Sequence, residues 1–435
     1  MAASEHLTLE RRRRPRTAVE SVAIVGLGYV GLPTALSLHR AGARVIGIDV
    51  SAERLKLVRR RMVDLTSADH GRLEQALADP GRFHLTRRAA AAAEADAVIV
   101  CVPTPIDRHH VPDLRALEAA ARTVSQNARP GQVIILTSTA YVGSTRQLIV
   151  EPLRRRGLVA GIDVCVAFSP ERIDPANDAY PQELVPRVIG AVSDRCADRA
   201  EAVIRLVAPA TTRVSSPEAA EMTKLYENVF RAVNISLANE LADACRELEL
   251  SPREVIDAAA TKPFGFMPFR PGPGVGGHCI PCDPHYLIWQ LRARKVHLPL
   301  VEQAMTAIAL RPAHVVARAA EVMSHVRHRG LKDARVLIVG VAYKPGVADI
   351  RESSALALLA GLRRGGADVS YYDPLVPVVE TDTGPLISVA GPPYAAGYDL
   401  VIAHTVHPDV DHGFLDDAWP LLDCTYSVGA RRIEL

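Results

Sequence analysis

Residues 22–31 read VAIVGLGYVG, and the fold of the N-terminal part of the chain can be predicted from this stretch. An apolar run compatible with a strand leads into glycines spaced G-x-G-x-x-G, and residues 33–40 have a helical composition. Glycines at these positions permit a tight turn, the approach of a pyrophosphate to backbone N–H groups, and close packing of helix on strand. The stretch therefore predicts a dinucleotide site at Gly26, Gly28, Tyr29, Val30 and Gly31.

An acidic residue follows the second predicted strand of this unit. Residues 44–48 are apolar, and they end at Asp49, 18 residues after Gly31. A carboxylate in this place binds the ribose hydroxyls of NAD and repels the 2′-phosphate of NADP, so the sequence predicts NAD as cofactor. The nearby Arg54 is the side chain that could pair with a phosphate instead.

Four further apolar runs are predicted to be parallel strands of the same sheet, because helix-compatible stretches separate them; they are residues 97–102, 133–136, 164–168 and 187–191. Three of these runs end in polar or rigid residues, each of which could be only a turn. Because ligands gather at the carboxyl ends of parallel strands, we expect a site at this edge. Its candidate residues are Thr104, Pro105, Thr139, Glu171 and Arg172.

A long helix is predicted to start at Ser216, because Pro217 suits the first helical position and no glycine or proline follows until after Leu250. Glu221, Lys224 and Asn228 fall on one face of this helix, so a lysine and an amide can point together at a ligand oxygen. The alternative is a solvated face with a Glu221–Lys224 ion pair. A helix of this length between two α/β halves also suits the interface of a homodimer or higher homo-oligomer.

Residues 271–287 read PGPGVGGHCIPCDPHYL and predict a rigid loop, since glycine and proline are poorly compatible with a helix interior or a central strand. We interpret Cys279 as a nucleophile, with Asp283 four residues later and with Gly276 and Gly277 letting the backbone approach a ligand. Two alternatives are a structural turn with an inert cysteine and a zinc or dithiol site at Cys279-x-x-Cys282. No second cysteine pair or H-x-x-x-H follows, so no metal is predicted.

A second α/β unit is predicted from residues 334–373. A strand at 334–339 ends at Gly340, a helix spans 354–364, and GADV at 366–369 leads to Asp373, much as GARV at 42–45 leads to Asp49. The G-x-G-x-x-G pattern is absent there and GVAYK stands in its place. We therefore expect a different phosphate-bearing ligand, held by side chains such as Lys344 and Arg351, with Tyr343 in the same segment as a further candidate for substrate binding.

Composition limits the class of protein. The chain has 435 residues, a net charge of +2 and one basic run at residues 11–16, which reads as a flexible tail rather than a nucleic-acid-binding arm. Seven scattered cysteines indicate reduced thiols. No signal-peptide core and no apolar run of about 18 residues is present. We expect a cytoplasmic protein that binds neither nucleic acid nor membrane.

These motifs together resemble the nucleotide-sugar 6-dehydrogenases of the UDP-glucose/GDP-mannose dehydrogenase family. The resemblance covers about residues 20–425. It is carried by GYVGLP (28–33), PTP (103–105), ST (138–139), PE (170–171), EMTKLYEN (221–228), GGHCIP-x-DP (276–284) and YKP…RES (343–353). Within the family, TKPFGFMPF (261–269) and SPERIDP (169–175) are most similar to the UDP-N-acetylhexosamine branch, in particular the UDP-N-acetylglucosamine 6-dehydrogenases.

The resemblance implies two α/β Rossmann-like doubly wound domains joined by a long central helix and a helical dimerisation region. The domains would be a flexible tail at 1–20, an NAD-binding domain at 21–214, a helical domain with the cysteine loop at 215–325 and a UDP-sugar-binding domain at 326–435. The implied chemistry is oxidation of a sugar C6 hydroxyl to a carboxylate by two NAD, through a thiohemiacetal and a thioester on Cys279.

The resemblance also implies roles for other residues. Lys224 would stabilise an oxyanion, Asn228 and Asp283 would hold or activate water, and Thr139 and Glu171 would help to position it. Lys344 would contact the nucleotide sugar and Arg351 the NAD. The chain departs from the family pattern at Tyr141, Ala176, Arg270, Cys282, His285, Gly346 and Ala348, of which Arg270 lies beside the glycine loop and could reach sugar or phosphate oxygens.

Other functions remain open from the sequence. The substrate could be UDP-glucose or UDP-N-acetylmannosamine. A single-step hydroxyacid dehydrogenase could use the same sheet and the lysine–asparagine helix without a cysteine. A non-catalytic NAD-binding protein is the third alternative, against which the intact set of Lys224, Asn228, Cys279 and Asp283 argues.

Overall fold

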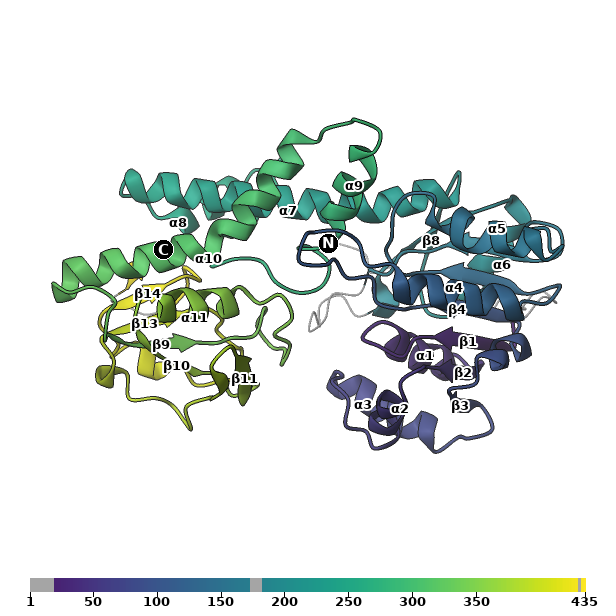
Figure 1. Cartoon of the computed structure of the whole chain (residues 1–435), viewed down its shortest axis with the longest axis horizontal. Helices are drawn as coiled ribbons and strands as arrows, with labels where there is room; N and C mark the ends of the chain where they lie inside the picture. Colours follow the sequence, from purple (N-terminus) through teal and green to yellow (C-terminus); the bar gives the residue numbers. More distant parts are fainter. Residues whose placement is uncertain (1–18, 173–181, 429–431) are drawn as a thin grey trace, which may run out of the picture.

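A computed structural model describes residues 19–172, 182–428 and 432–435 of the chain. Two α/β units lie at opposite ends of the molecule, and the long helix α7 (Pro217–Glu247) extends along the top of both (Figure 1). The predicted fold class, two Rossmann-like units joined by a long helix, is confirmed. The domain boundaries stay predictions, and of the proposed tail at 1–20 all but residues 19 and 20 lies outside the described residues. The same holds for Ala176 and for the last three residues of SPERIDP.

The larger sheet has eight strands in the order β3-β2-β1-β4-β5-β6-β7-β8. The strands are β1 (Ser21–Val25), β2 (Arg44–Ile48), β3 (Phe83–Thr86), β4 (Ala97–Val100), β5 (Val133–Leu136), β6 (Cys165–Phe168), β7 (Arg187–Ala191) and β8 (Thr211–Val214). The helices are α1 (Gly31–Arg40), α2 (Ala52–Arg59), α3 (Ser67–Leu77), η1 (Ala89–Glu94), α4 (Arg115–Asn127), η2 (Arg146–Val150), α5 (Glu151–Arg155), η3 (Gln182–Leu184) and α6 (Asp194–Ile204). Alternate residues of β1 are buried in different cores, Val22 and Ile24 in one and Ala23 and Val25 in the other. Burial on both faces explains why the strands are continuously apolar.

One expectation about this sheet is wrong. Strand β7 runs antiparallel to β6, with Ala167 opposite Ala191 and Phe168 opposite Gly190. A parallel pair needs a crossover, usually a helix, whereas the described part of the connection between β6 and β7 contains only the short helix η3. The strand direction therefore follows from the connection and not from the apolar run itself.

The predicted long helix is confirmed. Ser216 caps α7 by accepting a hydrogen bond from the backbone N–H of Ala219, and Pro217 occupies the first turn. Its 31 residues span roughly 46 Å. The buried Arg311 donates to Asp243 of α7 at 2.9 Å and to the carbonyl of Gly272 at 3.0 Å, which anchors the glycine loop. The other helices of this region are α8 (Pro252–Ala260), α9 (Asp283–Arg292) and α10 (Pro299–Arg327).

The second sheet has five strands in the order β10-β9-β13-β14-β15, all paired in parallel. Its strands are β9 (Arg335–Val339), β10 (Asp368–Tyr372), β13 (Leu400–Ala403), β14 (Leu421–Asp423) and β15 (Ile433–Glu434). The unit also contains α11 (Ser354–Arg364), the antiparallel pair β11 (Val378–Thr381) and β12 (Gly384–Ile387), and the short helices η4 (Ala395–Gly397) and η5 (Gly413–Leu415). No helix among the described residues is long and apolar enough to cross a bilayer.

Candidate active site

The first glycine turn leaves space at one position only. Gly26 has φ +93°, and a Cβ added to it would lie 2.4 Å from the carbonyl oxygen of Cys101. A Cβ on Gly31 would lie 1.8 Å from the carbonyl oxygen of Gly26. A Cβ on Gly28 would meet no atom within 4 Å. Two glycines are therefore required for packing, and the third faces an open space at the place where the sequence predicts the pyrophosphate of NAD.

Asp49 is fixed at the end of β2 beside this turn. Its carboxylate accepts hydrogen bonds from the backbone N–H groups of Leu27 and Ser51, both at 2.9 Å, and is partly exposed. The Nε of Arg54 donates to the carbonyl oxygen of Leu27 at 2.7 Å. These bonds fix Asp49 beside the turn with part of the residue exposed, which is where the predicted ribose contact would lie, and they hold Arg54 against the backbone.

The strand ends that were predicted to form a site meet at one edge of the sheet. The hydroxyl of Ser138, after β5, accepts from the N–H of Val102 and donates to its carbonyl, both at 2.8 Å. The carbonyl of Thr104 accepts from the hydroxyl of Tyr286 in α9 at 3.1 Å. Thr139, which follows Ser138, is half-buried. The turn at Thr104 and Pro105 is thereby attached to the helix that follows the cysteine loop.

Glu221 has a role that the sequence did not reveal. Its buried carboxylate accepts hydrogen bonds from the backbone N–H of Thr145 at 2.8 Å and from the hydroxyls of Ser144 at 2.9 Å and Thr145 at 2.6 Å. The alternative Glu221–Lys224 ion pair is therefore wrong, because the carboxylate is committed to the loop that follows Thr139. In the sequence, the one indication that Glu221 faces the interior was its position on the same helix face as Lys224.

Charges from several separate motifs act on the sulfur of Cys279. Cys279 is an exposed residue, yet desolvation of its sulfur raises the pKa of Cys279 to about 11. Asp283 also raises the pKa, Lys224 and Arg351 lower it, and Glu171 raises it. At neutral pH the resting group is therefore a thiol, and a nucleophilic role requires a nearby base.

Asp283, four residues after Cys279, has the chemistry of such a base. It is buried at the start of α9, and its carboxylate accepts a hydrogen bond from the amide of Asn228 in α7. Burial raises the pKa of Asp283 to about 6, although the charge of Lys224 and the bond from Asn228 act in the opposite direction. A carboxyl group with such a pKa can accept and release a proton near neutral pH.

The residues after β6 are held by ion pairs. Glu171 pairs with the buried Arg187 of β7 at 2.6 Å, and Arg172 pairs with Glu227 of α7. The sequence analysis did not identify Arg187 as a site residue, because the apolar residues around it in the strand do not indicate that it pairs with Glu171. Strand β7 thus supplies the cation that positions Glu171 near Cys279.

The glycine loop packs closely on the C-terminal unit. A Cβ on Gly276 would lie 2.6 Å from the Cβ of Tyr343, and one on Gly277 would lie 2.8 Å from its ring. The N–H of Gly277 donates to the carbonyl of Arg351 at 2.9 Å. The half-buried Lys344 lies in the same segment as Tyr343.

Arg351 connects the two α/β units. Its guanidinium pairs with Asp349 at 2.6 Å and lies 4.1 Å from the ring centre of Tyr29 in the first glycine turn. Arg270, in contrast, pairs with Asp257 of α8, away from the loop turn at Cys279. Among the described residues, no group of three or more histidines, cysteines or acids is arranged to hold a metal.

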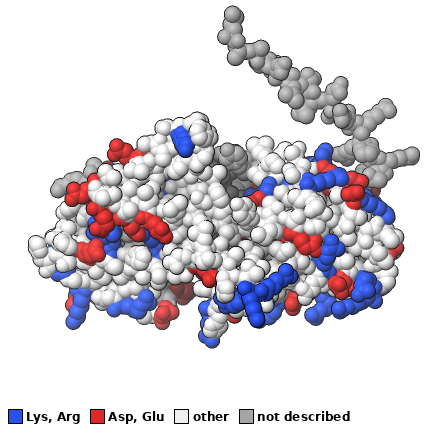
Figure 2. All heavy atoms as spheres, turned by 90° about the horizontal axis from the view of Figure 1, so that it is seen from above, with Lys and Arg blue, Asp and Glu red and all other residues white. Residues whose placement is uncertain are grey.

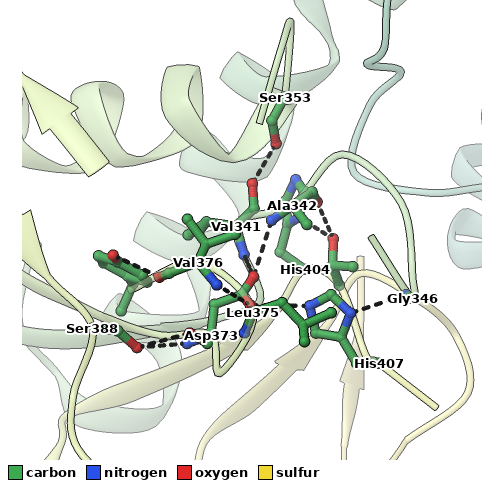
Figure 3. A network of polar contacts seen from close by, with 12 residues as sticks. Val341, Ala342, Gly346, Ser353, Asp373, Leu375, Val376, Ser388, His404 and His407 are labelled. Atoms are coloured by element: carbon green, nitrogen blue, oxygen red, sulfur yellow. Dashed lines mark hydrogen bonds and ion pairs between the residues drawn. The ribbon is translucent and has the colours of Figure 1, made fainter. Parts of the chain in front are cut away.

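The C-terminal unit contains a second glycine turn with the same backbone contacts as the first. Gly340 has φ +81°, and its N–H donates to Tyr372 as that of Gly26 donates to Ile48, both at 2.8 Å. Asp373 accepts from the N–H of Val341 at 2.8 Å and from His407 at 3.1 Å, and Figure 3 shows these bonds converging on its carboxylate. The structure thus supports the degenerate repeat inferred from GARV and GADV.

Comparisons with known proteins agree with this geometry. Three models of the UDP-glucose/GDP-mannose dehydrogenase family match: its NAD binding domain at residues 20–208, its central domain at 218–307 and its UDP binding domain at 337–424. The UDP-N-acetyl-D-mannosamine dehydrogenase of Pyrococcus horikoshii is 31% identical over 388 residues, which are 89% of this chain and 90% of that protein. The UDP-N-acetyl-D-glucosamine 6-dehydrogenase of Pseudomonas aeruginosa is 31% identical over 390 residues, with the same coverage.

A solved structure shares the whole architecture. The UDP-D-ManNAc dehydrogenase structure from Pyrococcus horikoshii superposes with a TM-score of 0.85 at 30% identity, covering 95% of this chain and 98% of that one. The chain therefore belongs to the UDP-glucose/GDP-mannose dehydrogenase family of NAD-dependent oxidoreductases.

Proposed function

We propose that this protein oxidises the C6 hydroxyl of UDP-N-acetylglucosamine to the carboxylate, with Cys279 as a covalent nucleophile. The observation that carries the proposal is the solvent-accessible thiol of Cys279 within reach of the charges of Lys224 and Asp283. A single oxidation of an alcohol requires no nucleophile, whereas the conversion of an aldehyde to an acid is made easier by a thioester. When bound, NAD would accept the hydride that leaves C6 in each oxidation.

The chemistry assigns the proton transfers to Asp283. After the first oxidation, the sulfur of Cys279 would attack the C6 aldehyde carbon, and its proton would pass to Asp283 directly or through water. The resulting thiohemiacetal carries an oxyanion that the ammonium of Lys224 would stabilise. Loss of hydride from C6 then leaves a thioester, and attack of water breaks the C–S bond, which releases the carboxylate and restores the thiol.

Further residues are assigned to binding and orientation. Asn228 would hold Asp283 and the water, with Thr139 and Glu171 beside them. Gly26, Gly28, Tyr29, Val30, Gly31, Asp49, Arg54, Thr104, Pro105, Thr139 and Arg351 would line the cofactor, and Glu171, Arg172, Lys224, Asn228, Arg270, Gly276, Gly277, Tyr343 and Lys344 the nucleotide sugar. The contact of Arg351 with Tyr29 supports this division, since it brings the second unit against the cofactor turn.

The proposed covalent mechanism is tested by measuring how many NADH molecules form for each sugar oxidised. Wild type should form two NADH per sugar and no free aldehyde, whereas Cys279→Ser should form no carboxylate at steady state. The matched control is Cys245→Ala in α7, 17 residues from Asn228 and so roughly 26 Å along the helix, which should keep wild-type turnover. One NADH per sugar, or near-normal turnover of Cys279→Ser, would remove the cysteine from the mechanism.

The choice of sugar is tested with a panel. We expect a higher specificity constant for UDP-N-acetylglucosamine than for UDP-glucose, because a site that hydrogen-bonds an acetamido group leaves buried groups unpaired when that group is absent. The names of the relatives also favour a second candidate, UDP-N-acetylmannosamine. Comparing the three sugars on wild type and on Arg270→Tyr shows whether Arg270 contributes. A preference for UDP-glucose would refute the branch assignment and leave the chemistry intact.

The proposed assembly is a homodimer through α7. Large apolar side chains at helical spacing are exposed along this helix, namely Met222, Tyr226, Phe230 and Leu237. In the view of Figure 2 the central part of the face is largely uncharged, with charged side chains to its left and right and a basic group along its lower edge. An exposed apolar stripe of this kind suits a second copy of the chain. Sedimentation should show a dimer that Tyr226→Glu with Phe230→Glu converts to a monomer, and a monomeric wild type would contradict the proposal.

A further inference from the structure

The mechanism leaves one thiol beside the nucleophile without a role. Cys282 lies three residues after Cys279, and it is 3% exposed whereas Cys279 is open to solvent. The backbone N–H of Cys282 donates to the carbonyl of Cys279 at 3.2 Å, and that of Asp283 donates to the same oxygen at 2.8 Å. Residues 279–282 therefore form one tight turn at the start of α9.

This turn suits a disulfide. Residues i and i+3 of a hydrogen-bonded turn have Cα atoms less than about 7 Å apart, and disulfides join Cα atoms about 4.4–6.8 Å apart. Burial is the main cause that raises the pKa of Cys282, and the neighbouring Cys279 adds to it. An accessible cysteine followed after two residues by a buried one at a helix N-terminus is also the arrangement of dithiol redox motifs.

We propose that Cys279 is a site of reversible oxidation by peroxide and that Cys282 is its resolving cysteine. In the first step the sulfur of Cys279 attacks one peroxide oxygen and the O–O bond breaks, so that the cysteine becomes a sulfenic acid and the peroxide is reduced to water or an alcohol. In the second step the sulfur of Cys282 attacks the sulfur of that sulfenic acid, which forms the disulfide and releases water. A dithiol reductant restores both thiols, and the thiol of Cys279 is spared irreversible oxidation.

The effect of the disulfide on activity rests on the proposed role of Cys279, but its formation does not. Burial raises the pKa of Cys279 to about 11 and that of Cys282 to about 12, so the reaction is slow at neutral pH and faster in alkaline buffer. Formation of the Cys279–Cys282 disulfide can be followed by mass spectrometry of a tryptic peptide, without any sugar substrate. Trypsin releases residues 254–292 as one peptide, since Lys262 and Arg270 both precede proline, and this peptide contains only these two cysteines.

The experiment treats the reduced full-length protein with hydrogen peroxide at about pH 9, followed by iodoacetamide. In wild type the peptide should be two hydrogens lighter and unalkylated until dithiothreitol is added, and NADH formation should be lost and then regained. Cys282→Val has a side chain of similar size at a buried position and should start with the same activity. Its peptide should instead carry sulfinic or sulfonic acid at Cys279, and dithiothreitol should not restore its activity.

Cys245→Ala should respond to peroxide like wild type. A wild-type peptide alkylated at both cysteines, or irreversibly oxidised at Cys279, would overturn the proposal, as would full recovery of Cys282→Val. If the disulfide forms in a protein that oxidises no sugar nucleotide, the proposed function fails and the redox site stands.

Discussion

The two glycine turns of this protein share one backbone plan and differ in what fills them. At the first turn Gly28 faces open space and Asp49 keeps part of its carboxylate exposed. At the second turn the position of Gly28 is taken by the buried Ala342, whose carbonyl accepts from the hydroxyl of Thr405 at 2.8 Å. The second turn is closed by side chains of its own unit.

The two aspartates make the same contrast. Asp373 is completely buried, and its two oxygens accept from the N–H groups of Val341, Ala342, Leu375 and Val376 and from the ring of His407 (Figure 3). No acceptor position is left for a ribose. One repeat thus leaves its acidic residue partly exposed, as the proposed ribose contact requires, whereas the other uses it to hold a loop, and the following variants test that difference.

Asp373→Asn should give the largest effect, a loss of about 3–5 kcal/mol in the free energy of unfolding. The N–H of Gly346 donates to Nδ1 of His407 at 3.0 Å, so the ring proton is on Nε2 and donates to Asp373. Every neighbour of the carboxylate is therefore a donor, and the amide group of Asn must face one of them. Urea unfolding measures the loss, and a variant as stable as wild type would show that the network contributes little.

Gly340→Ala should destabilise more than Gly28→Ala. At Gly340 the new Cβ would lie 1.8 Å from the carbonyl oxygen of Thr405 and φ is positive, so we expect a loss of more than about 2 kcal/mol. The new Cβ of Gly28→Ala would meet no atom within 4 Å, so the free energy of unfolding of this variant should lie within roughly 1 kcal/mol of the wild-type value. It should nevertheless weaken NAD binding, measured by calorimetry, because the methyl group enters the space proposed for the pyrophosphate. Equal losses of stability would contradict the distinction between the turns.

Asp49→Asn should mainly affect binding and should cost less stability than Asp373→Asn, because the partly exposed Asp49 accepts from two backbone N–H groups only, those of Leu27 and Ser51. We expect a loss of about 1–3 kcal/mol in NAD affinity, since the ribose loses a charged acceptor. NADP should be the poorer cofactor of wild type by about 2–4 kcal/mol, because the carboxylate repels its 2′-phosphate. In Asp49→Asn the difference in binding free energy between NAD and NADP should be smaller than in wild type. Equal kcat/KM with both cofactors in wild type would refute the role of Asp49, and Arg54→Ala would then show whether that arginine is the cause.

The smallest effect is a pH dependence. Burial alone would raise the pKa of Asp373, but hydrogen bonds from His407 and the N–H groups of Val341 and Ala342 outweigh it and hold the pKa below its usual value. Because the folded pKa is lowered, the stabilisation is fully present above the unfolded pKa of about 4 and is lost as pH falls through the folded pKa. The stability difference between wild type and Asp373→Asn should therefore be constant from neutral pH to about 4 and shrink below. A difference that grows on acidification would contradict this.

Much of the fold was predictable because its signals are local. The glycine spacing, the apolar runs and the Ser216–Pro217 helix start act within a few residues, and the elements that they predicted are present. The antiparallel direction of β7 was not predictable, since it depends on the connection and not on the strand. Candidate site residues such as Cys279, Lys224 and Asp283 were likewise visible as residue types in motifs.

By itself the sequence determined that the chain contains two glycine-turn units, a long capped helix and a reactive-looking cysteine loop. Only the tertiary structure decided that Glu171, Lys224, Asp283 and Arg351 act on the sulfur of Cys279, and that the turn at Gly28 is open while that at Gly340 is closed. The physical reason is that turn conformations follow from neighbouring residues. Burial, pKa shifts and the filling of a turn follow instead from partners far along the chain, as His407 is from Asp373.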